Sequence, residues 1–387
     1  MFKNLQNIFI LDGATGTELQ KRGLDKGVCP EKWVLENPAA LQDVQRRYAA
    51  AGSNVVYAPT FGANRASLKS HGFNADVRTL CRDLVAISRD AVPDNILVAG
   101  DLAPTGLQLL PFGTADFEEL VDIYTEQAFA LEEAGVDFFA IETQMSLPEA
   151  RAALMAVKKA STKPVIVSFA CGESGRSVMG TDLTAALLSL QHMGAAAYGI
   201  NCGGDLGLIT RLLKNMHPYS EIPLIAKPNA GMPDMSSGKA VYSMTGEDFA
   251  AAAADLVAAG AALMGGCCGT CEAHIAALAK ATAGLSPISL AAEHPLAAAS
   301  QTRVVNIDED TEFAEVAIDD DILDNMLEAM SEGAEVLRVH IRDEDDIELI
   351  DEYQYGLSLP LATSFEDDIL QGEFETVYHG KALIEER

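Results

Sequence analysis

Two adjacent cysteines, Cys267 and Cys268, and a third one upstream, Cys202, are the residues of this chain best suited to chemistry. They lie where apolar runs give way to glycines, within residues 199–204 and 264–270. Such a run is typical of a strand that ends in a tight turn. Three thiolates that converge from strand ends could hold one Zn²⁺ and leave its fourth position open. The sequence therefore predicts a metal centre that can bind a further ligand.

The adjacent pair restricts the path of the chain, because neighbouring side chains on a regular strand face opposite sides of the sheet. Cys267 and Cys268 can reach one metal only if the strand ends before them, and the surrounding glycines would permit that turn. Two alternatives stay open, namely small buried apolar residues or a redox-active vicinal pair. We expect Cys271 inside the following helix. The cysteines without a comparable context are Cys29, Cys81, Cys171 and Cys271.

A zinc ion held by three thiolates would be a weak Lewis acid for water, because the site as a whole is negatively charged. A substrate sulfur suits such a site better, since coordination lowers the pKa of a thiol while the electron-rich site leaves the thiolate nucleophilic. We therefore expect alkyl transfer to sulfur. No side chain is expected to act as a catalytic group beyond the zinc-activated substrate thiolate.

These residues need elements that bring strand ends together. Residues 1–285 alternate short apolar runs with segments of helical period, which indicates a parallel sheet covered by helices. Eight repeats of this kind predict an α/β fold, a (β/α)8 TIM barrel. Strands are expected at 8–12, 54–60, 96–101, 138–143, 165–169, 198–202, 224–228 and 263–266. Helices are expected at 39–51, 77–91, 117–134, 147–159, 184–193 and 246–259.

A doubly wound open sheet is the main alternative, but the glycine-rich dinucleotide fingerprint is absent after the first predicted strand. A barrel gathers its active-site residues at the C-terminal ends of its strands. Helix capping would place some Asp, Asn and Thr there, but it does not explain three cysteines. The polar residues at the predicted strand ends are Asp12, Thr60, Asp101, Glu142, Asn201, Cys202, Asn229, Cys267 and Cys268.

The chain has 387 residues and a net charge of −30, and this negative charge is concentrated in its C-terminal part. Residues 301–387 hold 26 Asp and Glu against 5 Lys and Arg. We expect a barrel at 1–285, a linker at 286–302 and a small acidic α/β domain of unknown function at 303–387. In that domain we expect a helix at 322–333 and loops at the acid runs 308–310 and 343–346.

The acidic surface either aids solubility or docks a basic partner. It disfavours nucleic acid and anionic membranes as partners. No apolar run approaches the roughly 20 residues of a membrane helix, and the first residues lack a signal-peptide pattern. An odd number of cysteines, 7, argues for reduced thiols. We therefore expect a cytoplasmic protein.

Seven short motifs, found along roughly residues 5–285 in the same order as in the family, resemble the homocysteine S-methyltransferase family. The resemblance is closest to the N-terminal homocysteine-binding module of cobalamin-dependent methionine synthase. The paired cysteines together with the upstream Asn-Cys are highly specific, whereas each shorter motif alone is weak. The motifs are LDGATGTE at 11–18, TFGAN at 60–64, GDLAPTG at 100–106, IET at 141–143, GINC at 199–202, PNAG at 228–231 and GGCCGT at 265–270.

The resemblance implies a role for each matching residue. Cys202, Cys267 and Cys268 would ligate one Zn²⁺, and Asn229 would fill the fourth position until the homocysteine sulfur displaces it. Asp12 and Glu142 would hold the substrate ammonium; the alternatives are a helix cap for Asp12 and a structural ion pair for Glu142. The backbone N–H groups of Gly13 and Ala14 would bind the substrate carboxylate. Thr60 and Asp101 are expected in the pocket or, alternatively, in turns.

The resemblance implies transfer of a methyl group to homocysteine, giving methionine. Full methionine synthases of this type continue into folate and cobalamin domains, so we expect the donor to be a methyl-corrinoid, or a methyl derived from methylfolate, presented by a separate protein. Cobalamin would then be bound only by that partner. Three alternatives stay open: a small donor such as S-methylmethionine or betaine, another thiol acceptor, or a non-enzymatic subunit that binds homocysteine or zinc. The residues at 332–339 faintly resemble part of the folate barrel, and nothing in the sequence fixes the oligomeric state.

Overall fold

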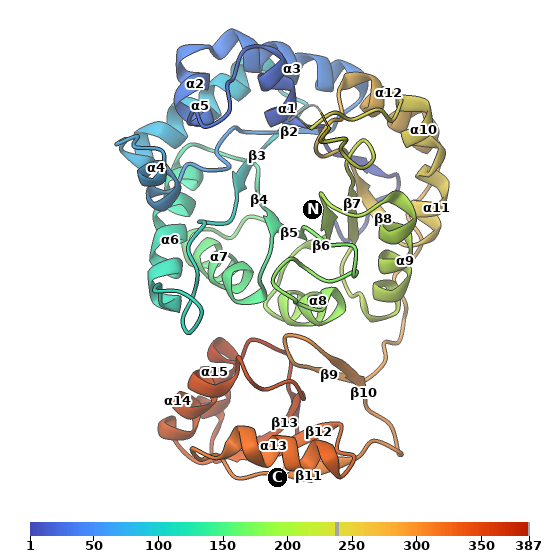
Figure 1. Cartoon of the computed structure of the whole chain (residues 1–387). Coiled ribbons are helices and arrows are strands. Elements are labelled where there is room, and N and C mark those ends of the chain that lie inside the picture. Colours follow the sequence, from blue (N-terminus) through green and yellow to red (C-terminus); the bar gives the residue numbers. More distant parts are fainter. Residues whose placement is uncertain (237–239, 386–387) are drawn as a thin grey trace.

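Eight parallel strands form one sheet in the order β1-β8-β7-β6-β5-β4-β3-β2, in a computed structural model that describes residues 1–236 and 240–385. The backbone N–H of Asn54 donates to the carbonyl of Ile10, and the N–H of Ile10 donates to Asn54 Oδ1, so β1 is linked to the start of β2 and the sheet curls into a nearly closed ring (Figure 1). The predicted TIM barrel is confirmed. Its strands are β1 Phe9–Ile10, β2 Val55–Tyr57, β3 Leu97–Leu102, β4 Phe138–Gln144, β5 Val165–Phe169, β6 Ala197–Asn201, β7 Leu224–Lys227 and β8 Ala261–Met264.

Helices surround this ring, and polar side chains set where several of them begin. Asp76, Asp116 and Ser146 each accept a hydrogen bond from a backbone N–H three residues on, which caps α5, α6 and α7. The helices of the barrel are α1 Thr15–Lys21, α2 Pro30–Glu36, α3 Pro38–Ala51, α4 Arg65–Ser70, α5 Val77–Ala91, α6 Phe117–Glu133, α7 Leu147–Ala160, α8 Leu183–His192, α9 Leu206–Met216, α10 Gly246–Ala251, α11 Ala253–Ala258 and α12 Glu272–Thr282, with a 3-10 turn at His217–Tyr219.

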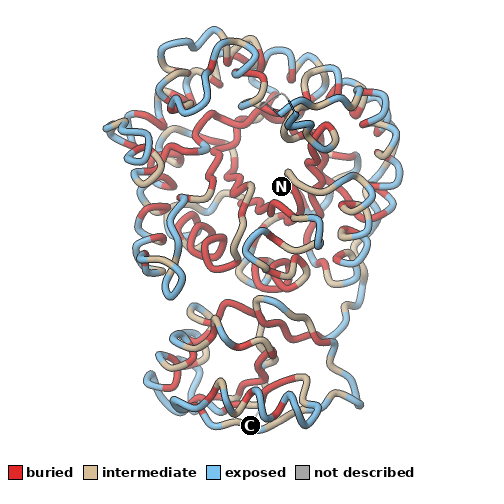
Figure 2. The backbone as a smooth tube through the Cα atoms, viewed as in Figure 1, coloured by how far each residue is buried: buried red, intermediate tan, exposed pale blue. Residues whose placement is uncertain are grey.

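Apolar side chains fill the N-terminal end of the ring. Phe2 packs edge-to-face on Phe9 and Phe138, at centroid distances of 5.4 and 5.3 Å, among buried residues from every side of the barrel. The strands are buried along their length while the outer helices expose one face (Figure 2). This end of the ring is therefore filled by side chains, and the cavity described below lies at the other, C-terminal end.

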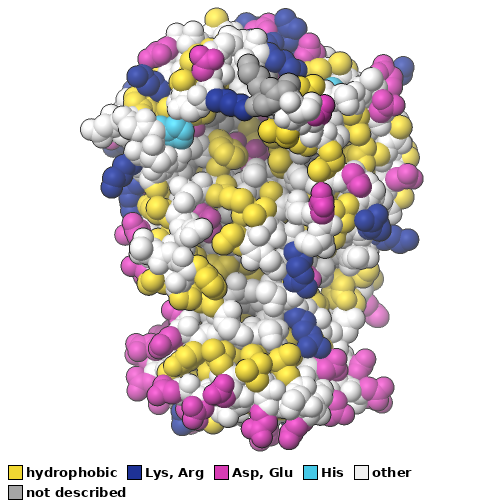
Figure 3. All heavy atoms as spheres, in the orientation of Figure 1, with side chains coloured by type: hydrophobic (Ala, Val, Ile, Leu, Met, Phe, Trp, Pro, Cys, Tyr) yellow, Lys and Arg dark blue, Asp and Glu magenta, His cyan; other side chains and the backbone are white. Residues whose placement is uncertain are grey.

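The C-terminal part of the chain is a second, four-stranded parallel sheet in the order β11-β12-β13-β14, preceded by an antiparallel hairpin, β9 and β10. Acidic side chains gather on this part of the molecule, which lies below the barrel in Figure 3. The appendage predicted from the charge pattern is therefore an α/β unit. Its elements are β9 Ala297–Ala299, β10 Val304–Asn306, β11 Phe313–Glu315, α13 Ile322–Ser331, β12 Val336–Ile341, α14 Glu344–Tyr353, β13 Leu361–Phe365, α15 Asp368–Val377 and β14 Leu383–Ile384.

Arg151, on α7 of the barrel, connects the two parts. It is 1% exposed, and its Nη2 donates to the carbonyl oxygens of Glu375 and Thr376 at the end of α15, at 3.0 and 3.1 Å. Its Nη1 donates to Ser189 Oγ at 3.0 Å. Burial lowers the pKa of Arg151 to about 10. The helix end, with its partial negative charge, is the compensation that the structure provides for this buried cation.

Some predicted elements differ from the observed ones. The helix expected at 246–259 is broken at Ala252 into α10 and α11, and nothing in the structure explains the break. The acid run 343–346 is not a loop, because Asp343 caps α14 and the next three acids occupy its first turn, where negative charge is favourable. The stretch 286–302 contains β9, whose three alanines are buried, so the division of the chain at 285 stays a prediction.

Candidate metal and substrate site

The three predicted cysteines come together at the C-terminal end of the barrel. Their sulfur atoms lie within 4.8 Å of one another, and Cys202 Sγ is 4.0 Å from Cys268 Sγ. Zinc–sulfur bonds of about 2.3 Å in a tetrahedron place sulfurs roughly 3.8 Å apart. Among residues 1–236 and 240–385, this is the one group of His, Cys, Asp or Glu side chains with the spacing of a metal site. The donor set and its spacing fit Zn²⁺.

The backbone leaves its strands where the sulfurs must converge. β8 ends at Met264, and the N–H of Cys267 donates to the carbonyl of Pro228 at 2.7 Å, which fixes the loop against the end of β7. Cys202 has a φ of 53°, a left-handed conformation that is costly for a residue with a side chain. The prediction that the strand ends before the cysteine pair is confirmed.

The side chains of Asn229 and Asn201 lie beside these sulfur atoms. Asn229 is buried, its side chain contributes to lowering the pKa of Cys202, and its Oδ1 has no hydrogen-bond partner among the described residues. A buried acceptor of this kind fits a displaceable fourth ligand. Asn201 Nδ2 donates to Thr143 Oγ1 at 2.7 Å and lies 3.7 Å from Cys267 Sγ. Sulfhydryl hydrogen bonds from Cys267 and Cys268 lower the pKa of Cys202 to about 3, so the cluster readily holds a thiolate.

Asp12 and Glu142 lie together beside the cysteines. Asp12 Oδ2 accepts the N–H of Tyr57 at 2.8 Å, whereas the residue that precedes α1 is Ala14 and no side chain caps this helix, so Asp12 is not a helix cap. Burial, partly offset by the neighbouring Lys227, raises the pKa of Asp12 to about 6. Burial also raises the pKa of Glu142. Both side chains line the same cavity.

Lys227, at the end of β7, lines the candidate site and was not predicted from the sequence. Its Nζ lies 2.9 Å from Glu142 Oε2, 3.3 Å from Asp12 Oδ1 and 3.9 Å from the centroid of the Tyr57 ring. The ion pair with Glu142 is the structural alternative considered from the sequence. A lysine inside a run of buried strand residues was the available signal, because an unpaired charge there would be costly.

Asp101 and Thr60 occupy different positions. Asp101 lines the cavity, its Oδ1 has no partner among the described residues, and burial followed by repulsion from Glu142 raises its pKa well above the usual range. Thr60 is fully buried and exchanges hydrogen bonds of 3.0 Å with the backbone of Asp101. Thr60 is not among the residues that line the cavity, so it holds β3 rather than facing a ligand.

The cavity has a volume of about 260 Å³ and opens at the C-terminal end of the ring. Gly13 and Ala14 contribute backbone to its wall. The N–H of Ala14 already donates to Thr270 Oγ1 at 3.1 Å, so it would have to exchange that bond to bind a carboxylate. Residues that line the cavity include Asp12, Thr15, Gly16, Thr17, Glu31, Tyr57, Phe61, Asp101, Glu142, Thr143, Cys202, Lys227, Cys267 and Cys268.

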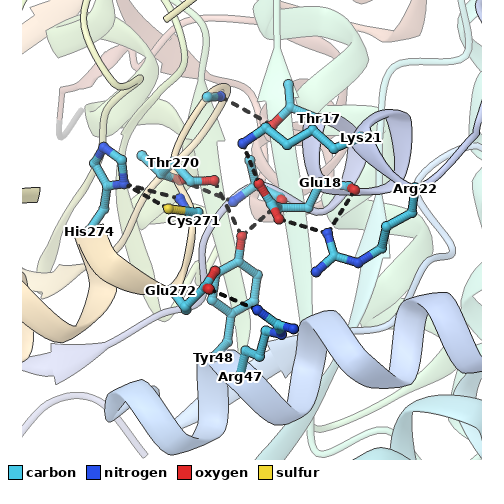
Figure 4. Close-up of polar contacts among 12 residues, drawn as sticks. Thr17, Glu18, Lys21, Arg22, Arg47, Tyr48, Thr270, Cys271, Glu272 and His274 are labelled. Carbon is cyan, nitrogen blue, oxygen red and sulfur yellow. Dashed lines mark hydrogen bonds and ion pairs between the residues drawn. The ribbon is translucent and has the colours of Figure 1, made fainter. Parts of the chain in front are cut away.

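A hydrogen-bonded framework supports the cysteine loop from the side of α3 (Figure 4). Tyr48 Oη donates to the carbonyl of Ala14 at 2.9 Å, and Thr270 Oγ1 donates to the carbonyl of Cys267 at 2.8 Å. Cys271 is the residue before α12 rather than part of it, and its sulfur lies 3.3 Å from His274 Nδ1 (Figure 4). The expectation that Cys271 lies inside the helix is wrong, because His274 accepts its backbone N–H and so defines the helix start.

The fold and the site define a TIM-barrel protein with three convergent thiols at the open end of the barrel. A model of the homocysteine S-methyltransferase family matches residues 9–282, and the chain belongs to this family. Methionine synthase of Mycobacterium tuberculosis is 30% identical over 300 residues, covering 72% of this chain and 25% of that relative. Methionine synthase of Mycobacterium leprae is 30% identical over 298 residues, covering 72% and 24%. The chain thus matches about a quarter of the length of these curated relatives.

A solved structure provides a second comparison. The metallated form of the homocysteine methyltransferase MmuM from Escherichia coli superposes with a TM-score of 0.61 at 28% identity. The match covers 71% of this chain and 96% of that one. The barrel part of this chain is therefore similar to a homocysteine methyltransferase along nearly the whole of that enzyme's length.

Proposed function

We propose that this protein is a zinc-dependent S-methyltransferase that transfers a methyl group to homocysteine and releases methionine. The observation that carries the proposal is one cavity that joins three convergent thiols to a pair of buried carboxylates. A homocysteine molecule has a thiol at one end and an ammonium group at the other, so both ends meet complementary groups. The family membership gives independent support.

In the proposed mechanism, Cys202, Cys267 and Cys268 would hold the metal, and Asn229 would be the displaceable fourth ligand. A zinc ion bound there would lower the pKa of the acceptor thiol and so supply a thiolate near neutral pH. Asp12 and Glu142 bind the ammonium group, and the backbone at Gly13 and Ala14 binds the carboxylate. Fixing both ends of the substrate aims its sulfur at the mouth of the barrel, where the donor methyl arrives.

The donor is proposed to be a methyl-corrinoid, and the similarity to relatives named methionine synthase supports this choice. A small donor such as S-methylmethionine or betaine is the second candidate. It is favoured by the match to 96% of a homocysteine methyltransferase that is itself a barrel of this size. Assaying the chain against each donor separates these cases, and a subunit that only binds homocysteine would turn over none of them.

The first test is zinc content and homocysteine binding in the wild type and in Cys268→Ser. We expect one zinc per chain in the wild type, and X-ray absorption at the zinc edge should show an additional sulfur after homocysteine is added. Cys268→Ser should lose at least about tenfold in zinc affinity, because a hydroxyl is a poor replacement for a thiolate ligand.

Cys271→Ser is the matched control, since Cys271 is three residues away and outside the sulfur cluster, and serine is a good residue to precede a helix. This variant should keep its zinc. A wild-type protein prepared with zinc and reduced thiols that holds no metal would contradict the proposed function.

A further inference from the structure

Lys227 Nζ is enclosed by three neighbours. It contacts Glu142 Oε2, Asp12 Oδ1 and the face of the Tyr57 ring, and the lysine side chain is 5% exposed. Two carboxylates and the face of an aromatic ring around one ammonium group favour its charged form inside the barrel. The lysine is therefore a fixed buried cation of the site.

The carboxylate oxygens of Glu142 and Asp12 differ in how many of their hydrogen-bonding positions are already occupied. Lys227 binds Oε2 of Glu142, which leaves Oε1 available on a side chain that lines the cavity. Oδ2 of Asp12 is bound by Tyr57 N–H, and Oδ1 has no hydrogen-bond partner among the described residues beyond its ion-pair contact with Lys227. Glu142 is thus held by one oxygen and can accept from a ligand with the other, whereas Asp12 is held through Oδ2 and keeps on Oδ1 only the longer 3.3 Å contact with Lys227.

The charge of the cavity is unbalanced. Among the described residues that line it, the acidic side chains are Asp12, Glu31, Asp101 and Glu142, and the one basic side chain is Lys227. Glu31 is satisfied by Gly62 N–H at 2.7 Å and by the Cys29 thiol. A cavity with this excess of acid favours a ligand that brings a positive charge.

We propose that Lys227 is a positioning residue that makes the cavity selective for thiols carrying an ammonium group, by fixing the carboxylates of Asp12 and Glu142. This inference rests on the proposed function, because it concerns the acceptor of that reaction. Lys227 acts through the carboxylates and not on the substrate carboxylate, since its Nζ is already surrounded by two anions and an aromatic face.

The test uses calorimetry to measure the binding of three thiols to the zinc-loaded protein, and in each of them three carbon atoms separate the sulfur from the charged group. Homocysteine carries both charged groups, 3-mercaptopropylamine lacks the carboxylate, and 4-mercaptobutanoate lacks the ammonium. In Lys227→Met, which keeps the length and loses the charge, the Kd of the two ammonium thiols should rise at least about tenfold. The Kd of 4-mercaptobutanoate should change less than about twofold, and zinc content should stay that of the wild type.

Two results would overturn the inference. Unchanged or tighter binding of the ammonium thiols to Lys227→Met would mean that Lys227 competes with their ammonium group for the carboxylates. A loss of affinity confined to homocysteine and 4-mercaptobutanoate would mean that Lys227 binds the ligand carboxylate. If Lys227→Met does not fold, Lys227→Arg decides: it should keep the preference for ammonium thiols over 4-mercaptobutanoate, and loss of that preference would overturn the inference. A wild-type protein that binds zinc but not homocysteine would instead contradict the proposed function itself.

Discussion

Asp12 is the single residue whose protonation the structure connects most directly to ligand binding. Because burial raises its pKa to about 6, the carboxyl group is neutral in the folded protein below that pH and ionised above it. An ionised carboxylate binds an ammonium group more strongly than a neutral carboxyl does. Affinity for the amino-acid ligand should therefore rise as the pH increases through about 6.

This pH dependence can be measured with methionine, the proposed product, whose thioether does not ionise and so leaves the carboxylates as the titrating groups. We expect the Kd for methionine to fall by about tenfold between pH 5 and pH 7. In Asp12→Asn the curve should be flatter, with weaker binding at pH 7. An unchanged curve in this variant would assign the titration to Glu142 or Asp101, whose pKa values are also raised.

Single residues also show how far a sequence can be interpreted. The three cysteines could be predicted because three thiols followed by glycines have few other uses. Lys227 could not, because its partners Asp12 and Glu142 lie 215 and 85 positions away in the chain and only the closed barrel brings them together. Thr60 was expected either in the pocket or in a turn, and in the structure its hydroxyl is bonded to the Asp101 backbone. Side-chain direction at a strand end is decided by tertiary contacts that no local pattern records.

At the scale of elements, the loop after β8 depends on glycines that tolerate close backbone contacts. A Cβ atom on Gly265 would lie 2.7 Å from the carbonyl oxygen of Asp12 and from Leu11 Cβ. Gly265→Ala should therefore lower the free energy of unfolding by about 1–3 kcal/mol and reduce zinc uptake, because β1 and the cysteine loop must separate. Chemical unfolding and elemental analysis would measure the two effects.

Gly372→Ala is the matched control for this prediction. Gly372 lies within α15, and nothing stands within 4 Å of an added Cβ atom. Alanine there should raise stability by up to about 1 kcal/mol and leave zinc content unchanged. Equal destabilisation by both substitutions would remove the special role of Gly265.

The boundaries of elements were harder to predict than their order. All eight barrel strands were expected, yet the second one ends at Tyr57, three residues earlier than predicted, because the N–H of Thr60 turns back to the carbonyl of Ala58. The appendage was predicted only in outline. Its edge strands β11 and β14 are only three and two residues long, too short to show an alternating pattern of their own, and are defined by pairing with β12 and β13.

At the scale of the whole molecule, Arg151 determines how firmly the appendage is held. Replacing it with Met would leave the carbonyls of Glu375 and Thr376 without their buried donor. An unsatisfied buried group costs about 1–3 kcal/mol, so Arg151→Met should lower stability by a few kcal/mol and expose the appendage to limited proteolysis. Zinc content should stay unchanged, because the cysteines lie on other elements.

His192→Gln is the control at the same contact, since His192 is half-exposed and only 3.7 Å from Glu375 Oε2. Its effect on stability should stay within about 0.5 kcal/mol. If Arg151→Met proved as mild as His192→Gln, the contact would not hold the two parts together.

Among the described residues, no helix has both the length and the apolar character needed to span a bilayer.

The pairing of β1 with β8 has a consequence for how the molecule comes into being. Phe9 is in register with Leu263, so the first strand to leave the ribosome must wait for the last strand of the ring before it gains this neighbour. The cysteine pair follows directly after that last strand, whereas Asp12 belongs to the first. A nascent chain cut short before residue 261 would thus contain the acids of the site but could neither close the ring nor assemble the three thiols. Metal uptake would mark the moment at which synthesis of the barrel is complete.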